Sequence, residues 1–293
     1  MAKSNLIFGC GYLGQRVARR WIAAGQRVFA VTRSQGNADR LAREGCQPIV
    51  ADVLRPPTLA RLPQVDVVLY AIGYDRASGA SIRTVYVDGL RAALDALPAA
   101  TGKFVYVSST GVYGQSGGEW VDEASACEPS REGGRACLAA EQLLAAHPLG
   151  ARAIVLRMAG LYGPGRIPNA AQIRGGEPVA APDEGWLNLI HADDAAAVVM
   201  AAAERAVAPR TYVVSDGAPV ERRAYYEELA RLLGGPPPEF TTPPPDSPAA
   251  TRSASSKRIR PTRMFSELDV RLEYPTFASG LAQAASVARI AED

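Results

Sequence analysis

A glycine-rich run near the N-terminus constrains the fold more than any other feature. Gly9-Cys10-Gly11-Tyr12-Leu13-Gly14 follows the apolar run Asn5–Phe8 and begins a stretch with apolar residues at Val17 and Trp21. This order predicts a strand, a glycine turn and a helix. The first glycine permits a tight turn, the second lets the backbone approach a pyrophosphate, and the third lets the helix pack close to the strand.

Phosphates in such a turn lie at the helix N-terminus, where free N–H groups and the helix dipole favour negative charge. The alternative interpretation is a glycine turn with a purely structural role. We expect a dinucleotide, bound in part by Gly9, Gly11, Tyr12, Leu13 and Gly14.

Strand-like and helix-like segments alternate through the first half of the chain. Strands are predicted at Asn5–Phe8, Arg27–Thr32, Gln47–Ala51, Val65–Ile72, Phe104–Ser108 and Arg152–Leu156. Helices are predicted at Tyr12–Ala24, Ala38–Glu44, Ser81–Leu97 and Arg131–Ala146. Several strands are almost continuously apolar, which is typical of strands buried on both faces. The pattern predicts an α/β fold, a doubly wound Rossmann-type parallel sheet with helices on both faces.

After Leu156 the pattern changes, and we expect a small C-terminal lobe. A Gly/Pro turn at Gly160–Gly165 is followed by a helix that Asp193 or Asp194 would cap. A proline-rich loop is expected at Pro236–Pro248. We assign residues 1–160 to the dinucleotide-binding domain, with a strand and helix returning to it at about 187–215. Residues 161–293 would mostly form a non-contiguous substrate-binding lobe.

Composition excludes several classes of function. The net charge of +2, without a basic run, argues against nucleic-acid binding. The alanine-rich stretch Ala195–Ala203 is too short to span a membrane, and no signal peptide is expected. Four scattered cysteines and two distant histidines offer no metal site and no disulfide framework. A reducing compartment, the cytoplasm, fits this composition best.

The end of the second strand favours NADP over NAD. An NAD-selective site has an acidic residue there, but no acid occurs from Gln26 to Asn37. Arg33 stands in its place, and Thr32 and Ser34 flank it. A guanidinium suits a 2′-phosphate, although Arg33 could also be an ordinary solvated residue. Asp52 could accept a hydrogen bond from the adenine amino group or cap the next turn. The other expected cofactor contacts are Val53, Ala71, Ile72 and Gly73.

Further segments carry a family resemblance along nearly the whole chain. Residues 107–114 read VSSTGVYG, residues 156–166 read LRMAGLYGPGR, and residues 188–194 read NLIHADD. Together with the glycine run, they resemble the extended and atypical short-chain dehydrogenase/reductases of the NAD(P)-dependent epimerase/dehydratase superfamily. The resemblance implies a hydride-transfer site in which Ser109 holds the substrate oxygen. It also implies a tyrosine acid/base with a lysine four residues later on the same helix face.

The chain departs from this pattern at the tyrosine and lysine. Alignment on Glu141 puts Gly133 at the tyrosine position and Cys137 at the lysine position. Shifting the alignment restores neither residue, because no lysine lies between Lys103 and Lys257 and no tyrosine lies between Tyr113 and Tyr162. Loss of a positioned acid/base typically lowers a rate by roughly 10²–10⁴-fold.

Several side chains could replace the missing dyad. The resemblance places Tyr113 and Tyr162 in turns around the pocket, and Tyr74 follows the fourth strand. We take Ser109 and Tyr113 as the candidate catalytic residues. Cys137 at the lysine position would face the ribose, so it is poorly placed as the proton donor.

Two functions from different classes remain open. One is an NADP-binding oxidoreductase or epimerase/dehydratase-like protein that acts on a small, sugar-like or phosphorylated substrate with a non-standard acid/base. The other is a catalytically silent NADP(H) sensor. If the protein is an enzyme, we expect an enclosed cavity beside the nicotinamide, with a protic side chain pointing into it. If it is a sensor, we expect this space to be filled by apolar side chains or open to solvent. By analogy with the family, a homodimer would form through residues 81–97 and 131–146.

Overall fold

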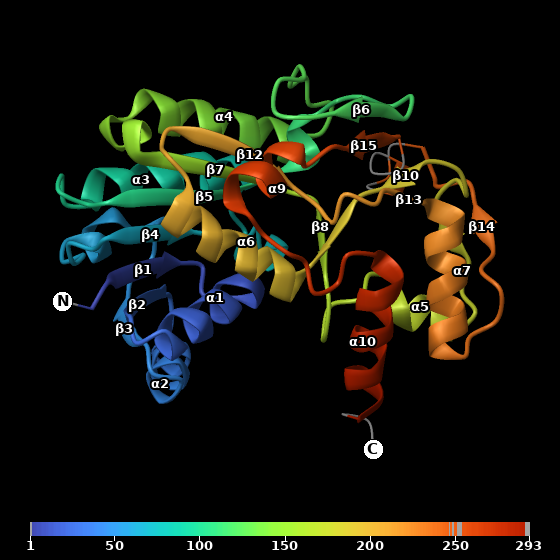
Figure 1. Cartoon of the computed structure of the whole chain (residues 1–293), viewed down its shortest axis with the longest axis horizontal. Coiled ribbons are helices and arrows are strands. Elements are labelled where there is room, and N and C mark those ends of the chain that lie inside the picture. The colour runs from blue at the N-terminus through green and yellow to red at the C-terminus, as the bar shows by residue number, and fades with distance from the viewer. Residues whose placement is uncertain (1, 246, 248, 251–253, 291–293) are drawn as a thin grey trace.

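A seven-stranded parallel sheet forms the centre of the molecule (Figure 1). The computed structural model describes residues 2–245, 247, 249–250 and 254–290. The strand order is β3-β2-β1-β4-β5-β7-β12. These strands are β1 (Ser4–Phe8), β2 (Arg27–Thr32), β3 (Gln47–Val50), β4 (Val67–Tyr70), β5 (Lys103–Ser109), β7 (Ala153–Met158) and β12 (Arg210–Val214). The predicted doubly wound α/β fold is confirmed.

Helices cover both faces of this sheet, and each face has its own apolar core (Figure 1). One core packs against α1 (Tyr12–Ala23), α2 (Gln35–Arg43), α6 (Ala192–Arg205) and α9 (Thr262–Leu268). The other packs against α3 (Gly89–Ala96) and α4 (Glu132–Ala146). Strands such as β1 and β4 are buried along their whole length, which explains their continuous apolar sequence.

The strand order reverses direction at β1. From β1 the chain proceeds outward through β2 and β3, and it then returns to the other side of β1 with β4. In open α/β sheets, ligands bind outside the carboxyl ends of the strands at such a switch point. The glycine turn that follows β1 therefore lies where a ligand site is expected.

A second group of short elements packs around a separate apolar cluster that includes Tyr162, Tyr225 and Leu281. Its helices are α5 (Ala170–Arg174), α7 (Arg222–Leu233) and α10 (Phe277–Ile290). Its strands and those near it are β6 (Glu119–Val121), β8 (Gly160–Tyr162), β9 (Val179–Ala180), β10 (Trp186–Leu187), β11 (Leu189–His191), β13 (Val220–Glu221), β14 (Phe240–Thr241) and β15 (Lys257–Ile259). The division at residue 160 stays a prediction.

One local prediction was wrong, and another was confirmed with a difference in helix type. The cap of α6 is His191, whose Nδ1 accepts a hydrogen bond from the Asp193 N–H at 3.3 Å, so neither aspartate is the cap. The helix predicted at Ser81–Leu97 contains a π-helical turn at Thr84–Asp88 before α3 begins. In the proline-rich segment, Phe240–Thr241 pairs with β9, while residues 246 and 248 lie outside the described part of the chain.

A buried ion pair joins the sheet to α4. Arg157 on β7 donates through Nη2 to Glu141 Oε2 at 2.7 Å. The other carboxylate oxygen accepts a bond from Ser108 Oγ at 2.5 Å. Arg157 also donates through Nη1 to the Tyr113 hydroxyl at 2.8 Å. Because both charged side chains are about nine-tenths buried, each depends on the other for compensation.

We expect the substitution Glu141→Gln to lower the free energy of unfolding by about 3 kcal/mol, because it leaves the Arg157 charge buried without a counter-ion. Urea unfolding followed by circular dichroism measures this. Glu228→Gln is the matched control, because its partner Arg231 is 68% exposed, and it should cost less than about 1 kcal/mol. An equal loss of unfolding free energy in the two variants would show that burial of the Arg157–Glu141 pair does not affect its contribution to stability.

Asp216, just after β12, is a buried carboxyl group with one orphaned oxygen. Its side chain is 6% exposed, Oδ1 accepts the Ala218 N–H at 3.0 Å, and Oδ2 has no hydrogen-bond partner. Burial, with a further contribution from the negative charge of Asp194, raises the pKa of Asp216 to about 7. The folded state therefore holds a proton on Asp216 over a pH range in which the unfolded chain has released it.

This difference predicts that the protein loses stability as the pH rises from about 4 to 7. A raised folded pKa means that the native state binds more protons there, so unfolding becomes easier with increasing pH. In Asp216→Asn this contribution is absent. Between pH 5 and pH 8, we expect the free energy of unfolding of the wild type to fall by about 2 kcal/mol relative to that of the variant, as measured by urea titrations. Parallel pH profiles for the two proteins would contradict the assignment.

Candidate active site

The three glycines of the turn after β1 differ in what surrounds them. Gly9 has φ +86°, and a Cβ there would lie 2.5 Å from the Ala71 carbonyl oxygen. A Cβ on Gly14 would lie 2.4 Å from the Gly9 carbonyl oxygen. A Cβ on Gly11 would meet nothing within 4 Å, and Gly11 begins α1 without a side-chain cap. Two glycines therefore permit close packing, and the third keeps the helix N-terminus open.

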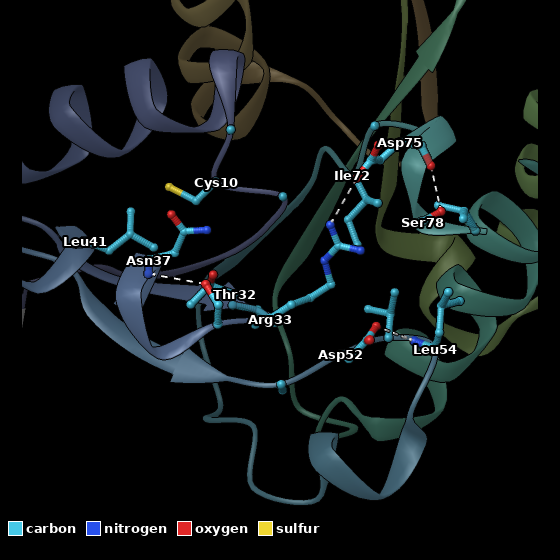
Figure 2. Close-up of a pocket in the computed structure, with 18 of the residues that line it drawn as sticks. Cys10, Thr32, Arg33, Asn37, Leu41, Asp52, Leu54, Ile72, Asp75 and Ser78 are labelled. Carbon is cyan, nitrogen blue, oxygen red and sulfur yellow. Dashed lines mark hydrogen bonds and ion pairs between the residues drawn. The ribbon is translucent and has the colours of Figure 1, made fainter. Parts of the chain in front are cut away.

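Two cavities meet at this turn. The first, here called the β2-side cavity, has a volume of about 360 Å³ and lies at the ends of β2 and β3 beside α2 (Figure 2). The second, the β4-side cavity, has a volume of about 320 Å³ and lies at the ends of β4 and β5 beside α4. Gly9, Gly11, Ile72 and Gly73 line both cavities.

The β2-side cavity carries more than one cation. Arg33 extends across it toward Asp75, with Nη2 at 3.6 Å from Oδ2, and both side chains are more than half exposed (Figure 2). Arg40 and Asn37, from α2, also line it. Ser34 caps α2 by accepting the Asn37 N–H at 3.4 Å. This arrangement can hold a charged phosphate at the cavity rim.

The predicted cofactor residues lie around these two cavities with one exception. Thr32, Arg33, Ser34, Asp52 and Val53 line the β2-side cavity, and Tyr12, Leu13 and Ala71 line the β4-side cavity. Gly14 lines neither, since its role is the close packing described above. Asp52 Oδ1 accepts the Leu54 N–H at 2.9 Å and so caps the following turn. Cofactor contact by these residues stays a prediction.

The two candidate catalytic residues lie in different places. Ser109 lines the β4-side cavity, and its Oγ accepts the Gly111 N–H at 3.0 Å. Tyr113 is 2% exposed and is not among the residues that line the cavity. Its hydroxyl is held by Arg157, and burial raises its pKa above the usual value. This geometry does not present the Tyr113 hydroxyl to the cavity, and its role as proton donor stays a prediction.

The other tyrosines considered from the sequence also lie outside the lining of the cavity. Tyr74 donates to the Ala80 carbonyl at 3.2 Å, and Tyr162 is fully buried beside Thr276. Cys137 does line the β4-side cavity, but it is 6% exposed. Burial raises the pKa of its thiol to about 12, so the thiolate is scarce at neutral pH.

Lys257 does not replace the missing lysine. Its Nζ donates to the Tyr113 carbonyl at 3.0 Å and to Ser255 Oγ at 2.9 Å. Burial lowers its pKa to about 8. The amine therefore joins β15 to the turn at Tyr113, and Lys257 is not among the residues that line either cavity.

Sequence reasoning missed four side chains at the cavities. Arg40 was assigned to an ordinary helix and Asn37 to the residue before it, although their position after the second strand could have indicated a phosphate contact. Tyr86 was assigned to a regular helix, and no local sequence pattern marks it as a residue that lines a cavity. Arg166 lines the β4-side cavity with its guanidinium 5.5 Å from the centre of the Tyr12 ring.

The residues that the structure describes include neither a membrane-spanning helix nor a metal-binding cluster. No helix among them combines the length and apolar character needed to cross a membrane. They also contain no cluster of three or more His, Cys, Asp or Glu side chains arranged to hold a metal ion.

Comparisons with known proteins agree with this geometry. A protein of Methylobacillus flagellatus, described as an NAD-dependent epimerase/dehydratase, is 33% identical, with 99% of this chain and 100% of that chain covered and a TM-score of 0.77. A conserved protein of unknown function from Silicibacter pomeroyi is 28% identical to this chain. The match covers 97% of this chain and 99% of that chain, with a TM-score of 0.79. UDP-glucose 4-epimerase of Thermotoga maritima, solved with UDP-glucose, shares the fold at 18% identity over 99% of each chain, with a TM-score of 0.82.

None of the curated proteins compared with the chain matches it. The model of the NAD dependent epimerase/dehydratase family matches residues 6–215, which include the glycine turn, both cavities and the main sheet apart from the first two residues of β1. The chain therefore belongs to the NAD-dependent epimerase/dehydratase family.

Proposed function

We propose that this protein is an NADP-dependent oxidoreductase or epimerase/dehydratase-like enzyme that acts on a small substrate in the β4-side cavity. The observation that carries the proposal is the pair of cavities that meet at the glycine turn. The β2-side cavity suits the adenosine half of a dinucleotide, and the open N-terminus of α1 at Gly11 suits its pyrophosphate. When it is bound in the β4-side cavity, the nicotinamide half of the dinucleotide supplies or accepts a hydride.

A cavity lined by side chains with protic groups favours an enzyme over a sensor. The β4-side cavity has a volume of about 320 Å³, and its lining includes Ser109, Tyr86 and Cys137, which carry hydroxyl or thiol groups. A silent sensor would need only the cofactor half of the site, and apolar side chains could fill the rest. Ser109 would hold the substrate oxygen, as the family resemblance implies.

The preference for NADP rests on the cations of the β2-side cavity. The last residue of β2 is Thr32, and Arg33 and Arg40 line the cavity beside it. Guanidinium groups bind phosphate through charge-assisted hydrogen bonds, and an acidic residue for the ribose 2′-hydroxyl is absent from the end of β2. The Arg33–Asp75 pair is exposed, so it competes only weakly with a 2′-phosphate.

The substrate class is inferred from charge and from the relatives. Arg166 is an exposed guanidinium at the β4-side cavity, where it could pair with a phosphate or carboxylate of the substrate. The Thermotoga maritima structure holds UDP-glucose on the same fold. A sugar-like or phosphorylated substrate therefore suits this cavity best.

A homodimer and a cytoplasmic location also remain part of the proposal. The cytoplasm is proposed because all four cysteines are free thiols.

The two glycines at opposite sides of the turn should respond differently to alanine. Gly11→Ala should leave the free energy of unfolding near the wild-type value but weaken NADPH binding roughly tenfold or more, because its methyl group would enter the space for the pyrophosphate. Gly14→Ala should cost about 1–3 kcal/mol of stability, because its Cβ would press on the Gly9 carbonyl. Urea unfolding and NADPH fluorescence titration measure the two effects. Unchanged NADPH affinity in folded Gly11→Ala would refute the pyrophosphate site.

Arg33→Ala should weaken NADPH binding by about ten- to a hundredfold, the usual worth of a hydrogen bond to a charged group, and leave NADH binding nearly unchanged. Arg43→Ala is the matched control, because this arginine is exposed on α2 and lies outside the lining of the β2-side cavity. Fluorescence titration with each reduced dinucleotide gives the two affinities. Equal losses for NADPH and NADH in Arg33→Ala would contradict the role of Arg33 at the 2′-phosphate.

A further inference from the structure

A reaction in the β4-side cavity needs a group that exchanges a proton with the substrate oxygen. The helix that carries the tyrosine and lysine in the resembling enzymes is α4, and in this chain it contains neither residue. Cys137 on α4 lines the cavity but is only 6% exposed, and the side chains with hydroxyl groups that line the cavity come from other elements. The cavity is lined by several hydroxyl-bearing side chains, so the question is which hydroxyl is both accessible and unoccupied.

Most of the candidates are already engaged or buried. Ser108 donates to Glu141 at 2.5 Å, and Tyr12 donates to the Pro164 carbonyl at 3.2 Å. Tyr70 and Tyr106 are 1% and 3% exposed, and their rings pack against each other in the core. None of these four hydroxyls is placed to give its proton to a substrate.

Tyr86 differs from them in exposure and in hydrogen bonding. It is half-buried, and its hydroxyl accepts the Tyr74 N–H at 3.2 Å. This bond orients the oxygen but does not use the hydroxyl proton, for which the described residues provide no hydrogen-bond acceptor. Burial raises the pKa of Tyr86, so the group stays protonated at neutral pH.

The backbone around Tyr86 is also unusual. Tyr86 lies in the π-helical turn Thr84–Asp88, and such turns are rare and frequently occur at functional sites. The segment packs against α4 where the resemblance puts the missing dyad. Ile82 Cδ1 lies 3.4 Å from the position of a Cβ on Gly133, and the Cys137 thiol is close enough to influence the titration of Tyr86. A tyrosine thus reaches the cavity from the segment facing α4.

We propose that Tyr86 is the catalytic residue that exchanges the proton with the substrate oxygen, beside Ser109. In the direction of reduction, the carbonyl carbon gains a hydride with its electron pair, and the C=O π bond breaks. The oxygen gains the proton of the Tyr86 hydroxyl, the dinucleotide is oxidised, and the tyrosinate regains a proton from water. The inference rests on the proposed function, because it requires a bound nicotinamide in the β4-side cavity.

The test begins with a signal that does not depend on turnover. The protein is labelled with [ζ-¹³C]tyrosine, and the resonance that is missing in Tyr86→Phe is assigned to Tyr86. Saturation with NADP⁺ should shift this resonance, because the nicotinamide enters the cavity beside the hydroxyl. The resonance of Tyr225, which is buried in the cluster around Tyr162, should not move.

The kinetic part uses NADPH and 9,10-phenanthrenequinone, a small dicarbonyl probe. Tyr86→Phe should bind NADPH as the wild type does but oxidise it roughly 10²–10⁴-fold more slowly. Tyr225→Phe is the matched control, because Tyr225 is buried in the cluster around Tyr162 and is not among the residues lining the cavity, and it should keep the wild-type rate.

Two outcomes separate this inference from the proposed function. If the wild type fails to bind NADPH in a fluorescence titration, the proposed function falls and this inference falls with it. If NADP⁺ binds but the Tyr86 resonance stays in place, or if Tyr86→Phe keeps its rate within a few-fold, the role of Tyr86 alone is overturned.

Discussion

The close approach of two backbone segments at the end of β1 governs the rest of the site. Gly9 passes against the Ala71 carbonyl at the end of β4, and Gly14 passes against Gly9 itself. A side chain at either position would force α1 away from the sheet. Because the contact is this tight, the N-terminus of α1 is fixed above the switch point of the sheet, and a cavity is left on each side of it.

Helix α4 packs tightly against the sheet although it contains no tyrosine and no lysine. A Cβ on Gly134 would lie 2.1 Å from the Gly111 carbonyl, so α4 lies directly against the turn after Ser109. On the same helix, the buried carboxylate of Glu141 accepts hydrogen bonds from Arg157 and Ser108. These contacts position the cavity wall, and they do not require a tyrosine or a lysine. The wall therefore does not depend on either residue, which is compatible with the donor proposed above, Tyr86 on the facing segment.

Much of this arrangement could be predicted from sequence because it depends on local pattern. The glycine spacing, the apolar strands and the missing acid after the second strand each belong to a short stretch of chain. Tyr113 shows the limit of such reasoning. Its position in the VYG turn suggested the cavity, but the Arg157–Glu141 pair, contributed by β7 and α4, draws its hydroxyl into the core.

The sequence by itself determined the doubly wound sheet, the glycine turn and the absence of the tyrosine–lysine dyad, because these follow from periodicity, residue type and order. The tertiary structure decided which hydroxyl groups face the cavity. Tyr86 enters it from a π-helical turn, and Tyr113 is excluded from it by a buried ion pair. Both outcomes depend on contacts between segments that are distant in sequence, so no local pattern could specify them.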